Sequence, residues 1–183
     1  MTTLKKTLIA LLSITIVVFS FTACNDDNNN DDSEWRDTNE EFYNKLADNK
    51  EYQIVSLPGA PDAVYYKVIK SGDPSGIKPY YTSKVKVLYY GYLYDGTTFD
   101  SGTKRDEDLY DQDPENYSPP TPYTFTINGL VEGFGIALQN MVPGDRWALW
   151  IPWPLGYGSV VNGTIPSYST LGFEVELVEV TKL

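Results

Sequence analysis

The residues that could take part in chemistry lie in one aromatic stretch of the chain. Residues 87–102 read VLYYGYLYDGTTFDSG, and in this stretch the acid Asp100 follows directly after Phe99. The sequence contains no histidine, and Cys24 is its single cysteine. Ser-His and Cys-His nucleophilic catalysis, histidine proton shuttles and the usual zinc sites therefore lose their central residue. Any activity of this chain has to work without these groups.

A purely structural interpretation explains most of the stretch. Asp95-Gly96 is a strong signal for a β-hairpin, in which Tyr90, Tyr92 and Tyr94 would form aromatic cross-strand pairs. The alternation of residues 84–89 puts Tyr89 on the same face as two valines that should be core. The hairpin explains less well why an acid follows Phe99 in a region that should be buried.

The elements around this stretch have mostly the period of strands. Alternating residues predict strands at 64–70, 84–89 and 146–151, and a last strand in which Phe173, Val175 and Leu177 alternate with Glu174 and Glu176. One short helix is predicted from apolar residues spaced at i, i+3, i+7 and i+10, namely Val131, Phe134, Leu138 and Met141. The fold class is therefore α+β, an antiparallel sheet with one helix across it.

The N-terminus has the pattern of an export signal. Lys5 and Lys6 precede an apolar run from Thr7 to Phe21, and residues 21–24 read FTAC, which resembles the lipobox of bacterial lipoproteins. We expect residues 1–23 to be a lipoprotein signal peptide and Cys24 to carry the lipid. The chain would then sit in the cell envelope of a Gram-negative bacterium, anchored to the outer membrane on its periplasmic or surface face. The alternative is an ordinary secretory signal followed by a chance cysteine.

The residues after Cys24 predict a tether and then a helix. Residues 25–32 read NDDNNNDD, with no apolar side chain, so 24–33 should be a disordered acidic tether. Residues 38–41 read TNEE, a capping-box pattern that opens a helix with Phe42 and Leu46 on one face. We expect 34–60 to be a helical appendage, anchored by Trp35.

The net charge of −11 argues against a nucleic-acid partner, because the sequence has no basic stripe that could bind phosphates.

From about Tyr66 to Val180 the chain resembles an FKBP-type peptidyl-prolyl cis-trans isomerase domain. The resemblance is carried by short blocks in a fixed order: VLYYG at 87–91, DG at 95–96, FDS at 99–101, PYTF at 122–125, VEGF at 131–134, MVPG at 141–144, IP at 151–152, GYG at 156–158, IP at 165–166 and TLGF at 170–173. It implies that 61–183 form an antiparallel β half-barrel wrapped around one short helix. It also implies prolyl isomerase activity; together with the expected lipid on Cys24, this predicts a lipid-anchored isomerase that assists the folding of exported proteins.

The resemblance further implies a set of site residues around an aromatic cleft. Tyr89, Phe99 and Asp100 would line one wall, with the Asp100 carboxylate binding the Tyr89 hydroxyl. The other lining residues would be Tyr123, Val131, Phe134, Tyr157, Ile165 and Phe173. The Tyr157 hydroxyl and the Ile165 N–H would hold the carbonyls of a proline-containing polypeptide. The resemblance implies neither a cofactor nor a metal.

The chain departs from the family pattern at three places. Phe134 stands where the family usually has Trp, and Tyr123 stands where it usually has Phe. An acid-rich insertion at 103–121 joins two walls of the cleft, and it lacks the spacing of a calcium-binding loop. We interpret the insertion as a solvated loop; the alternative is a loop that caps the cleft or selects substrates. These departures keep a second function open, a catalytically weak binding or chaperone module; the oligomeric state stays open as well.

Overall fold

The computed structural model describes residues 28–102 and 120–183, with side chains described from residue 33 onward. The predicted signal peptide, Cys24 and residues 103–119 of the predicted insertion lie outside these residues. The described strands form one antiparallel sheet in the order β1-β2-β6-β7-β3-β4, with β5 also paired to β3. The strands are β1 (Gln53–Val55), β2 (Val64–Lys70), β3 (Lys84–Leu93), β4 (Thr98–Asp100), β5 (Tyr123–Thr126), β6 (Arg146–Ile151) and β7 (Leu171–Lys182).

Strand β3 is the centre of the part of the sheet that forms the site. It pairs with β7 along its whole length, from Lys84↔Lys182 to Leu93↔Leu171. On its other edge, its first half pairs with β5 and its second half with β4. The turn between β3 and β4 contains Gly96 at φ +87°, which confirms the predicted Asp95-Gly96 hairpin. Side chains from three strands thus meet beside Tyr89.

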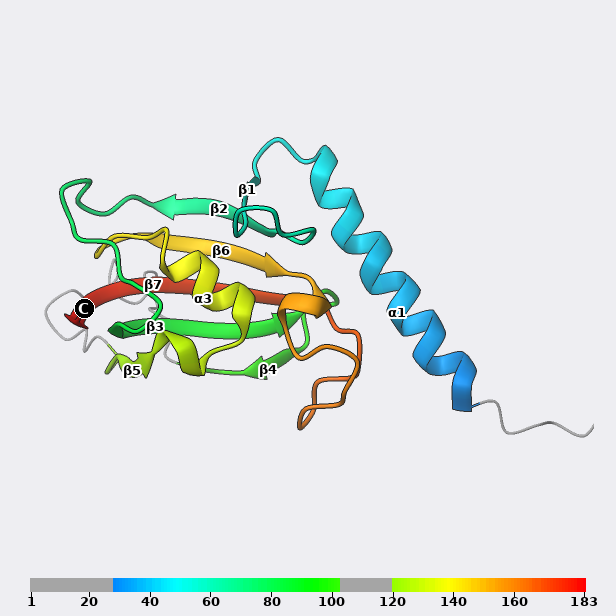
Figure 1. Ribbon diagram of the computed structural model, residues 1–183. Coiled ribbons are helices and arrows are strands. Elements are labelled where there is room, and N and C mark those ends of the chain that lie inside the picture. Colours follow the sequence, from blue (N-terminus) through cyan, green and yellow to red (C-terminus); the bar gives the residue numbers. More distant parts are fainter. Residues whose placement is uncertain (1–27, 103–119) are drawn as a thin grey trace, which may run out of the picture.

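The helix α3 (Glu132–Leu138) lies across one face of this sheet (Figure 1). Its buried side chains include Phe134, Ala137 and Leu138, and the sheet contributes fully buried residues such as Val87 and Leu177. The structure therefore confirms the predicted α+β class, and the predicted period-two segments are strands. Short 3-10 turns η1 (Leu46–Asp48), η2 (Ile127–Gly129) and η3 (Trp153–Leu155) complete the described elements.

The N-terminal helix α1 (Asn28–Lys45) begins earlier than the sequence predicted. Thr38 lies inside the helix, where its hydroxyl donates a hydrogen bond of 2.8 Å to the Glu34 carbonyl instead of capping the first turn. The predicted start at Thr38 and the predicted end of the tether at residue 33 are both wrong. Once a helix has formed its first turn, adding residues needs only backbone hydrogen bonds and no apolar side chains.

Helix α1 lies along one end of the sheet (Figure 1). Leu46 just beyond it is buried, and the Phe42 ring packs edge-on against Trp150 of β6 at 4.6 Å between ring centroids. Trp35 is an anchor as predicted, since its indole N–H donates a hydrogen bond to the Ser169 hydroxyl. Among the described residues, no helix combines the length and apolar character that crossing a membrane requires.

Candidate active site

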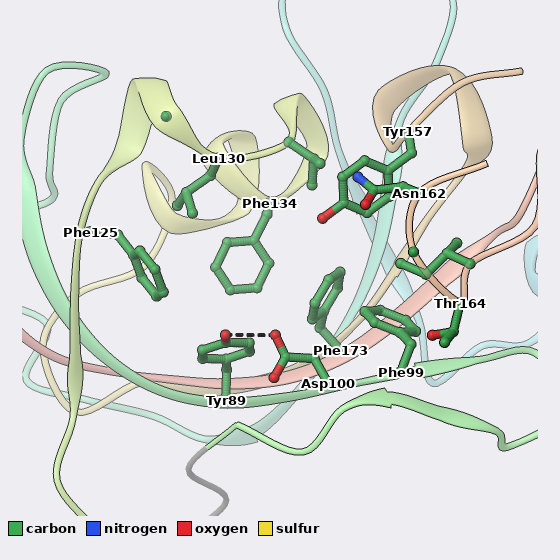
Figure 2. Close-up of a pocket in the computed structure, with 14 residues that line it drawn as sticks. Tyr89, Phe99, Asp100, Phe125, Leu130, Phe134, Tyr157, Asn162, Thr164 and Phe173 are labelled. Atoms are coloured by element: carbon green, nitrogen blue, oxygen red, sulfur yellow. Dashed lines mark hydrogen bonds between the residues drawn. The ribbon is translucent and has the colours of Figure 1, made fainter. Parts of the chain in front are cut away.

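A cavity of about 550 Å³ opens between α3, the β3–β4 hairpin and the segment 157–165. It brings together eight of the nine site residues predicted from the sequence: Tyr89, Phe99, Asp100, Val131, Phe134, Tyr157, Ile165 and Phe173. Figure 2 shows most of these side chains pointing into a common space from different elements. The remaining lining residues are Phe125, Gly129, Leu130, Asn162, Gly163 and Thr164.

Rings of Tyr89, Phe99, Phe134 and Phe173 form much of the inner surface, and we call this space the aromatic cavity. Phe173 of β7 lies at its centre, edge-on to Phe134 at 4.9 Å and to Phe99 at 5.5 Å between ring centroids. Tyr89 contacts Phe134 in the same T-shaped way at 6.1 Å. Edge-to-face contacts of this kind stabilise a fixed arrangement of rings. The cavity therefore presents a rigid apolar surface.

Gly91 makes the close packing of two of these rings possible. A Cβ atom at this position would lie 2.5 Å from Cε2 of Phe99 and 2.9 Å from Cε1 of Phe173. Both distances are shorter than carbon atoms can approach, so only glycine leaves room for the rings over β3.

One carboxylate lies beside this apolar surface. The Tyr89 hydroxyl donates a hydrogen bond of 2.8 Å to Oδ2 of Asp100, drawn as the dashed line in Figure 2, and this confirms the predicted pair. Oδ1 of Asp100 accepts a second bond of 3.0 Å from the Gly102 N–H. The β3–β4 hairpin sets this geometry, because Gly91 pairs directly with Asp100. The hydrogen bonds compensate a charged group for its partial removal from water.

The two tyrosine hydroxyls of the cavity are held in their neutral form. Burial, and then the hydrogen bond to Asp100, raises the pKa of Tyr89 well above its ordinary value. Burial, and then the charge of Asp100, also raises the pKa of Tyr157. Both hydroxyls therefore keep their protons at neutral pH. Because Tyr89 already donates to Asp100, Tyr157 is the phenol available to donate to a ligand.

Tyr123 does not line the cavity, although the resemblance implied that it would. Its side chain is 49% exposed, and its ring lies beside Tyr89 and Phe125 at 5.9 and 6.0 Å. Phe125, two residues further along β5, lines the cavity instead, and its ring contacts Tyr89 edge-on at 5.8 Å. Both side chains lie on the same face of β5, so the sequence pattern alone could not distinguish them.

The backbone of Ile165 is already hydrogen-bonded. Its N–H donates to the Asn162 carbonyl at 2.9 Å, and the Asn162 N–H donates back to the Ile165 carbonyl at 3.0 Å. The prediction that the Ile165 N–H holds a substrate carbonyl is therefore wrong for this structure. A tight turn at Gly163, where φ is +59°, uses that donor locally. The N–H of Val131, at the N-cap of α3, has no hydrogen bond to another described residue and is the better candidate donor.

Helix α1 holds the segment that carries Tyr157 and Ile165. The Thr170 N–H donates a hydrogen bond of 2.7 Å to the side chain of Asn39, which is fully buried. The Trp153 indole donates to Glu40 at 3.2 Å, and the Arg36 guanidinium lies 4.9 Å from the Tyr168 ring centroid. The hydrogen bond from Arg36 holds the pKa of Glu40 below its ordinary value, so this carboxylate stays charged. The appendage is thus bonded to both ends of the segment 153–170.

No cluster of acidic or cysteine side chains that could hold a metal ion occurs within residues 28–102 and 120–183. The cavity offers a ligand an aromatic surface, the Tyr157 hydroxyl and the Asp100 carboxylate, which accepts a hydrogen bond from the Tyr89 hydroxyl.

The chain matches known proteins over the part that forms this cavity. A model of the family described as FKBP-type peptidyl-prolyl cis-trans isomerase matches residues 76–178, more than half of the chain. The FKBP-type 22 kDa peptidyl-prolyl cis-trans isomerase of Escherichia coli is 40% identical over 116 residues, which are 63% of this chain and 48% of that protein. The outer membrane protein MIP of Legionella longbeachae is 35% identical over 131 residues, which are 69% of this chain and 49% of that protein.

The chain spans about half the length of these curated relatives. Among solved structures, a crystal structure of a peptidyl-prolyl cis-trans isomerase from Pseudomonas syringae pv. tomato superimposes with a TM-score of 0.65. It is 26% identical in sequence, and the match covers 82% of this chain and 96% of that one.

Proposed function

The chain belongs to the FKBP-type peptidyl-prolyl cis-trans isomerase family, and from this premise we propose that it catalyses cis–trans isomerisation of Xaa–Pro bonds in polypeptides. The observation that supports the proposal most directly is the aromatic cavity, with Phe134 and Phe173 at its base and the hydrogen-bonded Tyr89–Asp100 pair at its side. The reaction needs no nucleophile, metal or general base. It therefore suits a chain without histidine.

The physical task of such an enzyme is to favour a twisted amide. Rotation about a peptide bond has a barrier of roughly 18–20 kcal/mol, because the planar forms gain resonance between nitrogen and carbonyl. Halfway through the rotation this resonance is lost, and the amide is less polar than in either planar form. An apolar cavity that excludes water therefore binds the twisted form better than the planar ones, and this difference lowers the barrier.

Each residue has a definite part in this proposal. The proline ring packs against Phe134 and Phe173, which are almost fully buried and rigidly placed. The Tyr157 hydroxyl donates a hydrogen bond to a substrate carbonyl, and the Val131 N–H is a second donor beside the cavity. Asp100 fixes the Tyr89 ring through the 2.8 Å hydrogen bond. Each tenfold gain in rate requires about 1.36 kcal/mol, so desolvation and one or two hydrogen bonds are sufficient for useful catalysis.

We also propose that residues 61–183 act as the isomerase domain of an envelope protein that assists the folding of exported polypeptides. Support comes from the FTAC sequence, in which cleavage is expected between Ala23 and Cys24, and from the relative named outer membrane protein MIP. In this proposal the lipid on Cys24 anchors the chain to the outer membrane.

A protease-coupled assay on proline tetrapeptides tests the activity, with protein that begins just after Cys24. We expect kcat/KM to fall several-fold to about tenfold in Tyr157→Phe, as the loss of one hydrogen bond worth roughly 0.5–1.5 kcal/mol implies. Asp100→Ala should also lower kcat/KM. Tyr80→Phe, at an exposed tyrosine outside the cavity, is the matched control and should retain full activity. No activity on any peptide, from protein with a folded circular dichroism spectrum, would favour the binding or chaperone module instead.

A further inference from the structure

A second cavity of about 510 Å³ lies on the outer side of α3. We call it the outer groove and define it by Leu57, Tyr81, Ile127, Leu130 and Ile136, all of which line it. It is comparable in volume to the aromatic cavity. The two cavities share Leu130 and Val131, which line both. They therefore adjoin at the residues that lead into α3.

The helix itself shapes the groove. Glu132, Gly135, Ile136 and Gln139 of this region follow the i, i+3, i+4, i+7 spacing of one helix face, and all four line the groove. Gly135 is buried at this face of the helix. A Cβ atom there would lie 3.3 Å from Cγ2 of Ile127, so even a methyl group would crowd the space. The missing side chain therefore lets Ile127 pack closely against α3, and both residues line the groove.

The sides of the groove are apolar and open to water. Leu57, between β1 and β2, is 43% exposed, and Tyr81, before β3, is 60% exposed. The side-chain amide of Gln139 donates a hydrogen bond of 3.0 Å to the Gly135 carbonyl inside the helix. Glu132 is an exposed carboxylate at the start of α3. A concave apolar surface of this kind favours binding of apolar side chains.

Continuity with the aromatic cavity identifies the occupant. A polypeptide whose proline lies against Phe134 has to leave the aromatic cavity, and Leu130 and Val131 form its common border with the groove. An extended chain advances about 3.3–3.6 Å per residue, so residues a few positions from the proline reach beyond this border. The same chain can therefore occupy both cavities.

We propose that the outer groove binds the segment that flanks the prolyl residue of the substrate and selects apolar side chains in that segment. The preferred substrate is then an extended, unfolded polypeptide with apolar residues near the proline, rather than an isolated Xaa–Pro unit. This inference rests on the proposed isomerase function, and it adds a specificity subsite to the same site.

The test compares short and long peptides on two matched double variants. Leu57→Ser with Tyr81→Ser removes both exposed sides of the groove. Ile54→Ser with Tyr80→Ser is the control, because these side chains are 63% and 64% exposed and line neither cavity. The substrates are a tetrapeptide and decapeptides with the same Ala-Pro centre. The decapeptides carry leucine or serine three to five positions before or after the proline.

We expect the unaltered protein to isomerise a leucine decapeptide with a kcat/KM about tenfold above its serine counterpart, a ratio equivalent to roughly 1.4 kcal/mol. The groove variant should lose this preference and keep the tetrapeptide rate, whereas the control variant should keep both. Equal rates on leucine and serine decapeptides, or an equal loss of the leucine preference in both variants, would overturn the subsite. Activity on the tetrapeptide would still support the isomerase. Absence of activity on every peptide would overturn both proposals. Dissociation of a dimer by the groove variant alone would assign the groove to a second copy of the chain and overturn the subsite.

Discussion

The side-chain oxygen of Asn39 accepts a hydrogen bond of 2.7 Å from the backbone N–H of Thr170, at a position where Asn39 is fully buried. The two residues lie 131 positions apart in sequence. One belongs to α1, and the other ends the segment that carries Tyr157 and Ile165. The appendage is therefore part of the framework of the cavity.

Replacing Asn39 should lower both the stability of the protein and its kcat, although Asn39 does not line the aromatic cavity. Asn39→Ala leaves the buried Thr170 N–H without an acceptor, which should lower the free energy of unfolding by roughly 1–3 kcal/mol. It should also lower kcat at temperatures where the protein is still folded, because the Tyr157 segment loses a fixed end. Tyr43→Phe is the control, since it removes a hydrogen bond of 2.6 Å from the hydroxyl to the Ala63 carbonyl, which lies outside that segment. Equal kcat in the two variants at temperatures well below unfolding would contradict the positioning role.

Gly91→Ala should distort the aromatic surface directly. The new methyl group would meet Phe99 and Phe173 at impossible distances, so the rings must move. Overpacking of this kind typically lowers stability by about 1–3 kcal/mol, and we expect a fall in kcat/KM with it. Gly129→Ala is the matched control in the same cavity, because a Cβ atom there meets nothing within 4 Å. Urea unfolding and the coupled assay measure both effects; a silent Gly91→Ala would mean that the rings adjust without loss.

The activity should be independent of pH across the neutral range. The chain has no histidine, and the pKa values of Tyr89 and Tyr157 are raised, so neither phenol changes charge between about pH 6 and 9. The raised values also stabilise the folded state below about pH 10, where a phenol in the unfolded chain is still protonated. As pH rises further, unfolding releases a proton and stability falls. A pH–rate profile checks the first expectation, and urea midpoints at pH 8 and pH 11 check the second; a step in rate near neutral pH would contradict the first.

Phe134→Trp tests whether the smaller aromatic ring limits the enzyme. Phe134 packs against Phe173 at 4.9 Å beside a cavity of about 550 Å³, which leaves space for an indole on the open side. We expect kcat/KM to be kept or raised, because a larger ring buries more of the proline. Phe134→Ala should lower it by tenfold or more, which corresponds to about 1.4 kcal/mol or more of lost contact. Inactivity of both the unaltered protein and Phe134→Trp would count against the isomerase.

If Cys24 carries a lipid, the mature protein has a defined mass and sediments with a defined membrane fraction. Mass spectrometry of the full-length chain expressed in a Gram-negative host should show a mature protein that begins at Cys24 with acyl chains attached. The protein should sediment with outer membranes. Cys24→Ser should abolish both, because the hydroxyl does not replace the thiol that carries the lipid. An unmodified mature protein in the periplasmic fraction would instead support an ordinary secretory signal.

Most strands of the sheet could be predicted from the sequence. The strands at Val64–Lys70 and Arg146–Ile151 have the predicted boundaries, because short runs rich in β-branched and aromatic residues favour strands. The Tyr89–Asp100 hydrogen bond was implied by the family resemblance, and the pairing of Asp100 with Gly91 in the β3–β4 hairpin brings the two side chains together. These features depend on neighbours that are close in sequence.

Features that depend on contacts between residues far apart in the sequence could not be predicted from it. The predicted start of α1 was wrong because Trp35 and Asn39 hold the helix through hydrogen bonds to Ser169 and Thr170, more than 130 positions away. A local capping pattern gives no information on such contacts. The availability of the Ile165 N–H depended on a turn whose closure the sequence did not show. The choice of Phe125 over Tyr123 depended on where β5 lies against β3. The outer groove exists only because the chain brings Leu57, Tyr81 and Gly135 to one place, and the shape of a cavity is set by packing in three dimensions.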